Sequence, residues 1–263
     1  VIAEKYPLIL FGRYPIDQQW RALLACVIVL ATLGYGAHPA RWGRHLPWVW
    51  GLALLLAWVL MSGRLGPWSL QAWGLPPVAN DLWGGFPLTL MLSCVAITLA
   101  FPLAVLLALG RTGPWPLVSR LCALGIELVR GVPLVSVLFM ASFMLPLLWP
   151  TGQTPDVLWR VCAALTLFLA AYLAEVVRGG LQGVAQGQIM AGTALGLGYV
   201  DLQRHVVLPQ ALTHALPSLV NHFIGLFKDT SLVTIVSLYE LSGAMTLALS
   251  GDADWRPFKV EAY

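Results

Sequence analysis

Charged residues are absent from two long stretches of the chain, residues 82–110 and 131–155. An α-helix needs roughly 20 apolar residues, at about 1.5 Å each, to cross the hydrocarbon core of a bilayer. Each stretch is therefore long enough to span a membrane. Shorter apolar runs at 22–36, 46–63 and 161–174 can span if their charged flanks reach the interface. These runs do not alternate apolar with polar residues as outer-membrane strands do, so the pattern predicts helices.

The limits of the apolar runs predict the helices and their interruptions. Pro102 should kink the third helix, and Gly131 with Pro133 should break or bend the fourth, because proline removes a helix hydrogen bond. Residues 1–19 are mixed and are predicted to be interfacial, whereas the Gly-, Pro- and Trp-rich residues 64–81 are predicted to form an extramembrane loop. The expected helices lie at about 20–36, 46–63, 82–110, 117–148, 157–178 and 205–227, followed by an apolar segment to about 250.

The composition argues against a soluble domain. Of the 263 residues, 59% are hydrophobic and only 10% are charged, whereas a soluble domain usually carries about 25% charged residues. The mean hydropathy of +0.78 agrees, and most of the twelve Trp residues stand near the ends of apolar runs, as interfacial anchors do. A net charge of +3 without a Lys/Arg cluster gives no case for nucleic-acid binding. The four cysteines, each alone in an apolar run, are predicted to be buried, unpaired thiols.

Basic residues between the predicted helices indicate an orientation. If Arg41 and Arg44 are cytoplasmic, alternation also places Arg111, Arg120 and the 178–204 loop in the cytoplasm. The sequence therefore predicts that the 178–204 loop lies inside the cell.

That loop is a glycine-rich stretch that interrupts the apolar pattern. It is too polar to span a membrane and too apolar for an ordinary solvated loop. Small residues at 191, 192, 194 and 196 allow another backbone to approach closely, and Leu195 and Leu197 offer apolar knobs. A short helix with such a face suits docking into a groove on a partner. An interfacial helix lying on lipid remains the alternative.

The loop contains the motif Gly187-Gln188-x-x-Ala191-x-x-Ala194-Leu195-Gly196, followed by Leu208-Pro209-Gln210-Ala211. This motif resembles the EAA loop of ABC importer permeases, in the version found in their polar amino-acid branch. Further elements agree in the family's order: Glu127-x-x-Arg130-Gly131-Val132-Pro133, Tyr172-x-x-Glu175-x-x-Arg178-Gly179-Gly180 and Phe227-Lys228-Asp229-Thr230. Tyr14-Pro15-x-Asp17-Gln18-x-Trp20-Arg21 resembles the larger permeases of general L-amino-acid transporters.

The resemblance implies an all-α, polytopic transmembrane bundle with the type I ABC importer permease fold. Residues 1–81 would form an N-terminal extension with about two transmembrane helices and a periplasmic loop. Residues 82–263 would form the permease core, with a cytoplasmic coupling loop at about 179–204. The last core helix would be missing, and the chain is expected to be truncated at both ends.

The resemblance also implies a role and partners in the bacterial inner membrane. The chain would import amino acids together with a cytoplasmic ATPase dimer, a second permease subunit and a periplasmic amino-acid-binding protein. ATP and Mg would bind at the ATPase, and this chain would bind no cofactor. The residues that would couple to the ATPase are Gly187, Gln188, Ala191, Gly192, Ala194, Leu195 and Gly196.

One departure from the family affects the docking prediction. The family has Glu-Ala-Ala where this chain has Met190-Ala191-Gly192, so the usual acidic residue is missing. The grip on the ATPase is therefore expected to rest on shape and apolar contact rather than on a charge at position 190.

Charges within or beside apolar runs form a second candidate site, because such charges usually face the bundle or a water-filled path. Glu127 with Arg130 and Glu175 with Arg178 are i,i+3 pairs of opposite sign. They could line a pathway for a zwitterionic amino acid, or lock helices together near the cytoplasmic end, and the structural role is favoured. The predicted pathway or gate residues are Glu127, Arg130, Glu175, Arg178, Asn221, Gly225, Lys228 and Asp229.

The chain itself is not expected to hydrolyse ATP or to bind a metal. None of its three lysines follows a Gly-x-x-x-x-Gly phosphate loop, and the His spacings match no ligand pattern. Two rival functions remain. A membrane-embedded lipid-modifying enzyme would need clustered acidic or His residues, and a non-transporting scaffold subunit would not need the docking loop.

Overall fold

The computed structural model describes residues 2–150 and 154–251. They form two compact units that interleave along the chain. Unit one comprises Val1–Val95, Ala141–Val161 and Phe227–Tyr263, and unit two comprises Ala96–Met140 and Cys162–Leu226. These units do not follow the expected division at residue 81, which remains a prediction drawn from the family resemblance.

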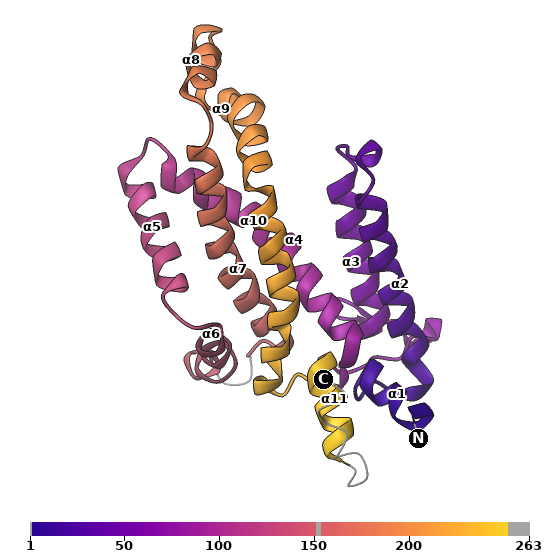
Figure 1. The fold of residues 1–263 in the computed structure, drawn as a ribbon. Coiled ribbons are helices and arrows are strands. Elements are labelled where there is room, and N and C mark those ends of the chain that lie inside the picture. Colours follow the sequence, from indigo (N-terminus) through magenta and orange to yellow (C-terminus); the bar gives the residue numbers. More distant parts are fainter. Residues whose placement is uncertain (1, 151–153, 252–263) are drawn as a thin grey trace. The chain divides into compact units, whose positions relative to one another are not determined.

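Unit one contains a helical hairpin, α2 (Gln19–Gly36) and α3 (Leu46–Ser62), which lie side by side in Figure 1. Ala22 and Ala25 of α2 and Ala53 and Ala57 of α3 are buried, so small side chains allow close helix contact. The opposite faces carry exposed leucines, as expected beside lipid. In the same unit, α1 (Ile2–Phe11) packs against α11 (Leu241–Ser250), and α1 is a helix that the sequence pattern did not predict.

The C-terminal end of α3 is held by two side chains, one from α2 and one from the segment that precedes it. Arg21, fully buried, donates from Nε to the Leu60 carbonyl at 2.7 Å and from Nη1 to the Pro76 carbonyl at 2.8 Å. The Tyr14 hydroxyl donates to the Met61 carbonyl at 2.8 Å, and burial raises the pKa of Tyr14 to about 12. The bonds to Leu60 and Met61 satisfy carbonyls that a helix leaves unpaired at its C-terminus, and the bond to Pro76 ties the following loop to α2.

The predicted extramembrane loop contains the two short strands of the described chain, a small exception to the all-α prediction. β1 (Arg64–Leu65) and β2 (Trp68–Ser69) pair antiparallel, with Arg64 opposite Ser69. Two 3₁₀ turns, Gln71–Trp73 and Asn80–Leu82, lead from this hairpin to α4.

Unit two supplies most of the candidate site. Helix α4 (Gly85–Thr112) begins in unit one and continues through unit two. Helix α10 (Leu208–Asp229) runs through unit two and ends in unit one. Along the described chain, α4 and α10 are separated by five α-helices: α5 (Pro116–Arg130), α6 (Leu134–Phe139), α7 (Val157–Gln182), α8 (Gln186–Ala194) and α9 (Tyr199–Leu202). A π-helical turn, Gln203–Val207, joins α9 to α10, and a 3₁₀ segment, Thr230–Val236, follows α10.

The predicted break in the fourth apolar segment is confirmed. The chain leaves α5 at Gly131, bends sharply, and enters α6 after Pro133, as expected where proline cannot continue the preceding helix. By length and composition, the described residues contain four helices able to cross a membrane, or five if this bent segment counts as one span. Helix α3 and α11 are apolar but shorter.

Candidate functional site

Helix α8 stands beyond the end of α7, at the tip of unit two in Figure 1 (orange). It is seated on a small apolar core formed by Val184, Leu202, Val207 and Ala211. A Cβ added to Gly192 would collide with the Leu202 side chain, so glycine at this position allows α8 to lie closely on α9. The core therefore fixes which face of α8 points inward.

Glycine also ends α8. Gly196 has φ +80°, and its N–H donates to the Thr193 carbonyl at 2.9 Å, while the Leu197 N–H donates to the Gly192 carbonyl at 3.2 Å. These two bonds form a Schellman motif, in which a residue with positive φ terminates the helix. The motif turns the chain back toward α9.

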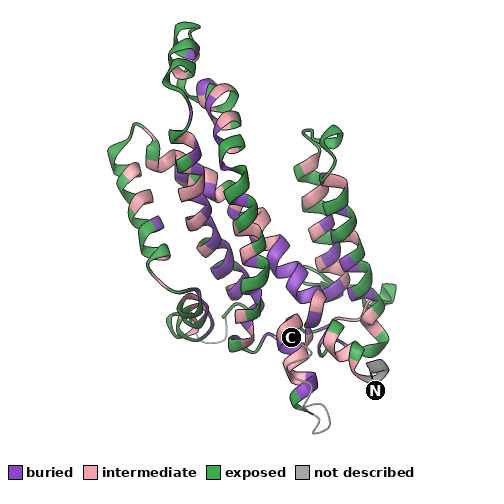
Figure 2. Cartoon of the chain, in the orientation of Figure 1, coloured by how far each residue is buried: buried purple, intermediate pink, exposed green. Residues whose placement is uncertain are grey.

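The outward face of α8 carries no charged side chain. Met190, at the position of the family's acidic residue, is 67% exposed, and Leu195 is 82% exposed. Charged residues are absent between Arg178 and Asp201. Of the predicted coupling residues, Gly192 is buried in the seat of α8, and Figure 2 shows the rest of the helix mainly exposed. The exposed members are Gly187, Gln188, Ala191, Ala194, Leu195 and Gly196.

The end of α7 and the start of α10 approach closely beneath α8. A Cβ at Gly180 would collide with the Ala211 carbonyl oxygen and lie 3.2 Å from the Ala215 Cβ. The Gln210 side chain donates to the Val206 carbonyl at 2.9 Å. The Leu208-Pro209-Gln210-Ala211 motif thus packs the base of the loop rather than its exposed tip.

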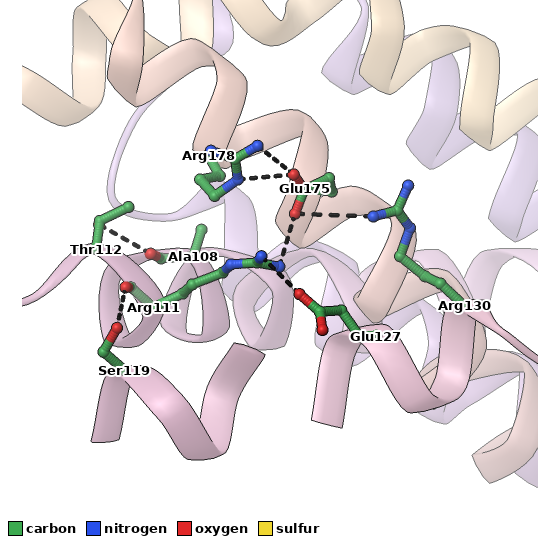
Figure 3. Close-up of polar contacts among 8 residues, drawn as sticks. All are labelled: Ala108, Arg111, Thr112, Ser119, Glu127, Arg130, Glu175 and Arg178. Atoms are coloured by element: carbon green, nitrogen blue, oxygen red, sulfur yellow. Dashed lines mark hydrogen bonds and ion pairs between the residues drawn. The ribbon is translucent and has the colours of Figure 1, made fainter. Parts of the chain in front are cut away.

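Glu175 of α7 is the centre of an ion-pair cluster that joins α4, α5 and α7 (Figure 3). Its Oε1 accepts from Arg178 Nε at 2.7 Å and also from Arg178 Nη2. Its Oε2 accepts from Arg111 Nη1 at 3.1 Å and lies 3.8 Å from Arg130 Nη1. Arg111 Nη2 also donates to Glu127 Oε1 at 2.9 Å.

The cluster confirms one predicted pair and replaces the partners of the other. Glu175 and Arg178 are paired as their spacing predicts. Glu127 instead contacts Arg111, and Arg130 contacts Glu175. Arg111 was not among the predicted site residues. The available signal was its place directly after the long uncharged stretch 82–110.

The remaining predicted pathway residues follow one another along α10. Asn221 is exposed and Gly225 is half-buried one turn later, with no atom within 4 Å of an added Cβ. Lys228 and Asp229 are exposed at the C-terminal end of the helix. The structure describes their positions, and their role in a pathway stays a prediction.

Apolar helices long enough to cross a membrane, an uncharged helix at one end and an ion-pair cluster among the spans together indicate a polytopic subunit of a membrane transport system. Residues 100–252 match the model of the family "Binding-protein-dependent transport system inner membrane component". The chain belongs to this family.

Two curated relatives match the whole chain. The "Inner membrane amino-acid ABC transporter permease protein YhdY" of Escherichia coli (strain K12) is 42% identical over 266 residues, covering 100% of this chain and 70% of the relative. The "Glutamate/glutamine/aspartate/asparagine transport system permease protein BztC" of Rhodobacter capsulatus is 36% identical, covering 100% of this chain and 72% of the relative.

A solved structure agrees with the fold. The "Crystal structure of an amino acid ABC transporter with histidines" has a TM-score of 0.57 and 26% identity, covering 68% of this chain and 83% of the other. The chain therefore has the type I permease fold and is a multi-pass inner-membrane permease subunit of an ABC importer. Its family role is transport rather than the chemistry of a lipid-modifying enzyme.

Proposed function

We propose that this permease subunit moves amino acids into the cell. The support comes from relatives whose names specify amino-acid transport and which match the full length of this chain at 42% and 36% identity. A periplasmic amino-acid-binding protein would deliver the substrate, and a second permease subunit would complete the pathway. The residues Glu127, Arg130, Glu175, Arg178, Asn221, Gly225, Lys228 and Asp229 would line or gate it.

The exposed face of α8 is proposed to dock on a cytoplasmic ATPase dimer, which would bind the ATP and Mg. The observation that carries this proposal is the combination of an inward face fixed by Gly192 and an outward face of small, apolar and uncharged polar residues. An amphipathic or small-faced helix laid in a groove is a common recognition mode. Closure of the ATPase moves the permease only if the two conformations dock with different free energies.

The experiment introduces a charge at Leu195, the exposed residue that caps the C-terminal end of α8, as Leu195→Asp. Because this side chain is 82% exposed, the substitution removes little packing from the fold. We expect the complex to lose the ATPase on purification and to lose uptake into proteoliposomes. Ser69→Asp, which puts the same charge on the exposed β1–β2 hairpin, is the control and should retain both. Normal ATPase retention by Leu195→Asp would instead favour the interpretation that α8 lies on lipid.

A further inference from the structure

The ion-pair cluster around Glu175 holds more positive than negative charge. Arg111, Arg130 and Arg178 surround two carboxylates, those of Glu127 and Glu175. Glu175 is only 20% exposed, so it interacts with all three arginines in surroundings that screen charge less than water does. Among the described residues, one positive charge in the cluster is therefore left without a matching carboxylate.

Of the three arginines, Arg130 has the longest contact with Glu175. Its contact with Glu175 is 3.8 Å, beyond hydrogen-bond distance, whereas Arg111 and Arg178 bond the same carboxylate at 3.1 and 2.7 Å. Its side chain is also the most exposed of the three, at 37%. The surplus charge of the cluster is thus concentrated on a guanidinium that is accessible to a ligand.

The backbone places Arg130 at the end of a broken helix. It is the last residue of α5, and the chain bends at Gly131–Pro133 before α6 begins. Broken helices within membrane proteins are tolerated where the freed backbone groups are buried in protein or line a cavity. In many transporters such interruptions are found beside substrate sites.

An aromatic ring lies beside the guanidinium, and further rings pack against that ring. The Arg130 Cζ lies 5.4 Å from the centre of the Tyr172 ring, and the Tyr172 hydroxyl donates to the Arg130 carbonyl at 3.4 Å. Phe168 lies one turn before Tyr172, with 4.8 Å between ring centres, and His222 of α10 lies 6.1 Å from Tyr172. The Tyr172 ring thus provides an aromatic surface against the Arg130 guanidinium.

We propose that Arg130 binds the α-carboxylate of an amino acid in transit, releasing its contact with Glu175, and that Tyr172 holds the guanidinium in place for it. This inference rests on the proposed function. The planar guanidinium donates two parallel hydrogen bonds to a carboxylate, a geometry that its present contact with Glu175 lacks. Glu175 keeps Arg111 and Arg178 when Arg130 leaves, so the exchange strands no carboxylate.

The test uses the complete transporter in lipid nanodiscs without the binding protein. Retention of a radiolabelled mixture of L-amino acids is measured, and the retained amino acid is then competed with its own carboxamide, which lacks the carboxylate. We expect Arg130→Gln to weaken retention by at least about tenfold. Arg130→Lys should give an intermediate value, because lysine keeps the charge but loses the planar fork. Arg120→Gln, an exposed arginine of the same helix, is the matched control and should bind as wild type does.

The Glu175→Gln variant distinguishes a role of Arg130 in ligand binding from a purely structural role of its contact with Glu175. If Glu175 competes with substrate for Arg130, its neutralisation should strengthen retention, and this gain should vanish in the Arg130→Gln background. The carboxamide should compete at least tenfold more weakly than the acid in wild type and equally well in Arg130→Gln.

Uptake into proteoliposomes by the wild-type transporter, here with its binding protein and ATP, is run in parallel. If no amino acid is taken up, the proposed function fails. If uptake occurs but Arg130→Gln retains substrate as wild type does, or the Glu175→Gln gain persists without Arg130, the inference about Arg130 fails while the proposed function stands.

Discussion

Gly196 allows the docking proposal to be tested through backbone conformation alone. Its φ of +80° lies in the left-handed region, and no atom lies within 4 Å of an added Cβ. Gly196→Ala therefore neither fills nor crowds the structure, and its effect is the conformational cost of a side chain in this region, roughly 1–2 kcal/mol. At about 1.4 kcal/mol per factor of ten, 1 kcal/mol lowers the equilibrium constant for forming the native α8–α9 turn about fivefold.

The affinity of the nanodisc-embedded permease complex for its ATPase is the quantity to measure. We expect Gly196→Ala to weaken binding by up to about fivefold, because apparent affinity falls with the fraction of the native turn. Gly196→Asn should weaken it less, because asparagine tolerates positive φ. Gly198→Ala is the matched control in the same loop, since Gly198 has φ −69° and open space around its Cβ position. Equal effects of the alanine substitutions at 196 and 198 would refute the reasoning from the Schellman turn.

Three further outcomes are expected. Gly180→Val should destabilise the protein by about 1–3 kcal/mol, because its Cβ would collide with the Ala211 carbonyl oxygen. Gly179→Ala, whose Cβ would meet no atom within 4 Å, is the control and should not lower stability in this way. Thermal unfolding in detergent compares the two variants. Arg21→Met should lower stability by about 1–3 kcal/mol in the same assay, because the Leu60 carbonyl at the end of α3 and the Pro76 carbonyl lose their donor. An unchanged melting temperature would contradict this. A cysteine at Gln186 should react with an impermeant thiol reagent only from the cytoplasmic side, and labelling from outside would invert the predicted topology.

Features that depend on neighbouring residues were predicted from the sequence. The break between α5 and α6 follows from Gly131 and Pro133, whose effects on a helix are local. A short helix was expected from the small residues of the loop, and α8 is that helix; its docking role stays a prediction. Helix α1 was missed because Ile2–Phe11 contains Pro7 and mixed charges, and it is held by packing against α11, more than 200 residues away in the chain.

Partner choice in the candidate site was not predictable in the same way. The i,i+3 spacing of Glu127 and Arg130 suggested that they pair with each other, but the packing of α5 places Glu127 at Arg111 and Arg130 at Glu175. Arg111 and Glu175 are 64 residues apart, and sequence spacing carries no information about such a contact. Similarly, the small residues of α8 are alike in the sequence, and only the core beneath Gly192 distinguishes the inward from the outward face.

The sequence by itself determined that this chain belongs in a membrane and that its fourth apolar segment breaks at Gly131–Pro133. It could do so because a lipid environment requires long apolar segments whose backbone groups bond within the segment. The tertiary structure decided which arginine meets which carboxylate and which face of α8 is free. Those choices depend on how each helix is rotated about its axis, and that rotation is set by contacts between residues far apart in the chain.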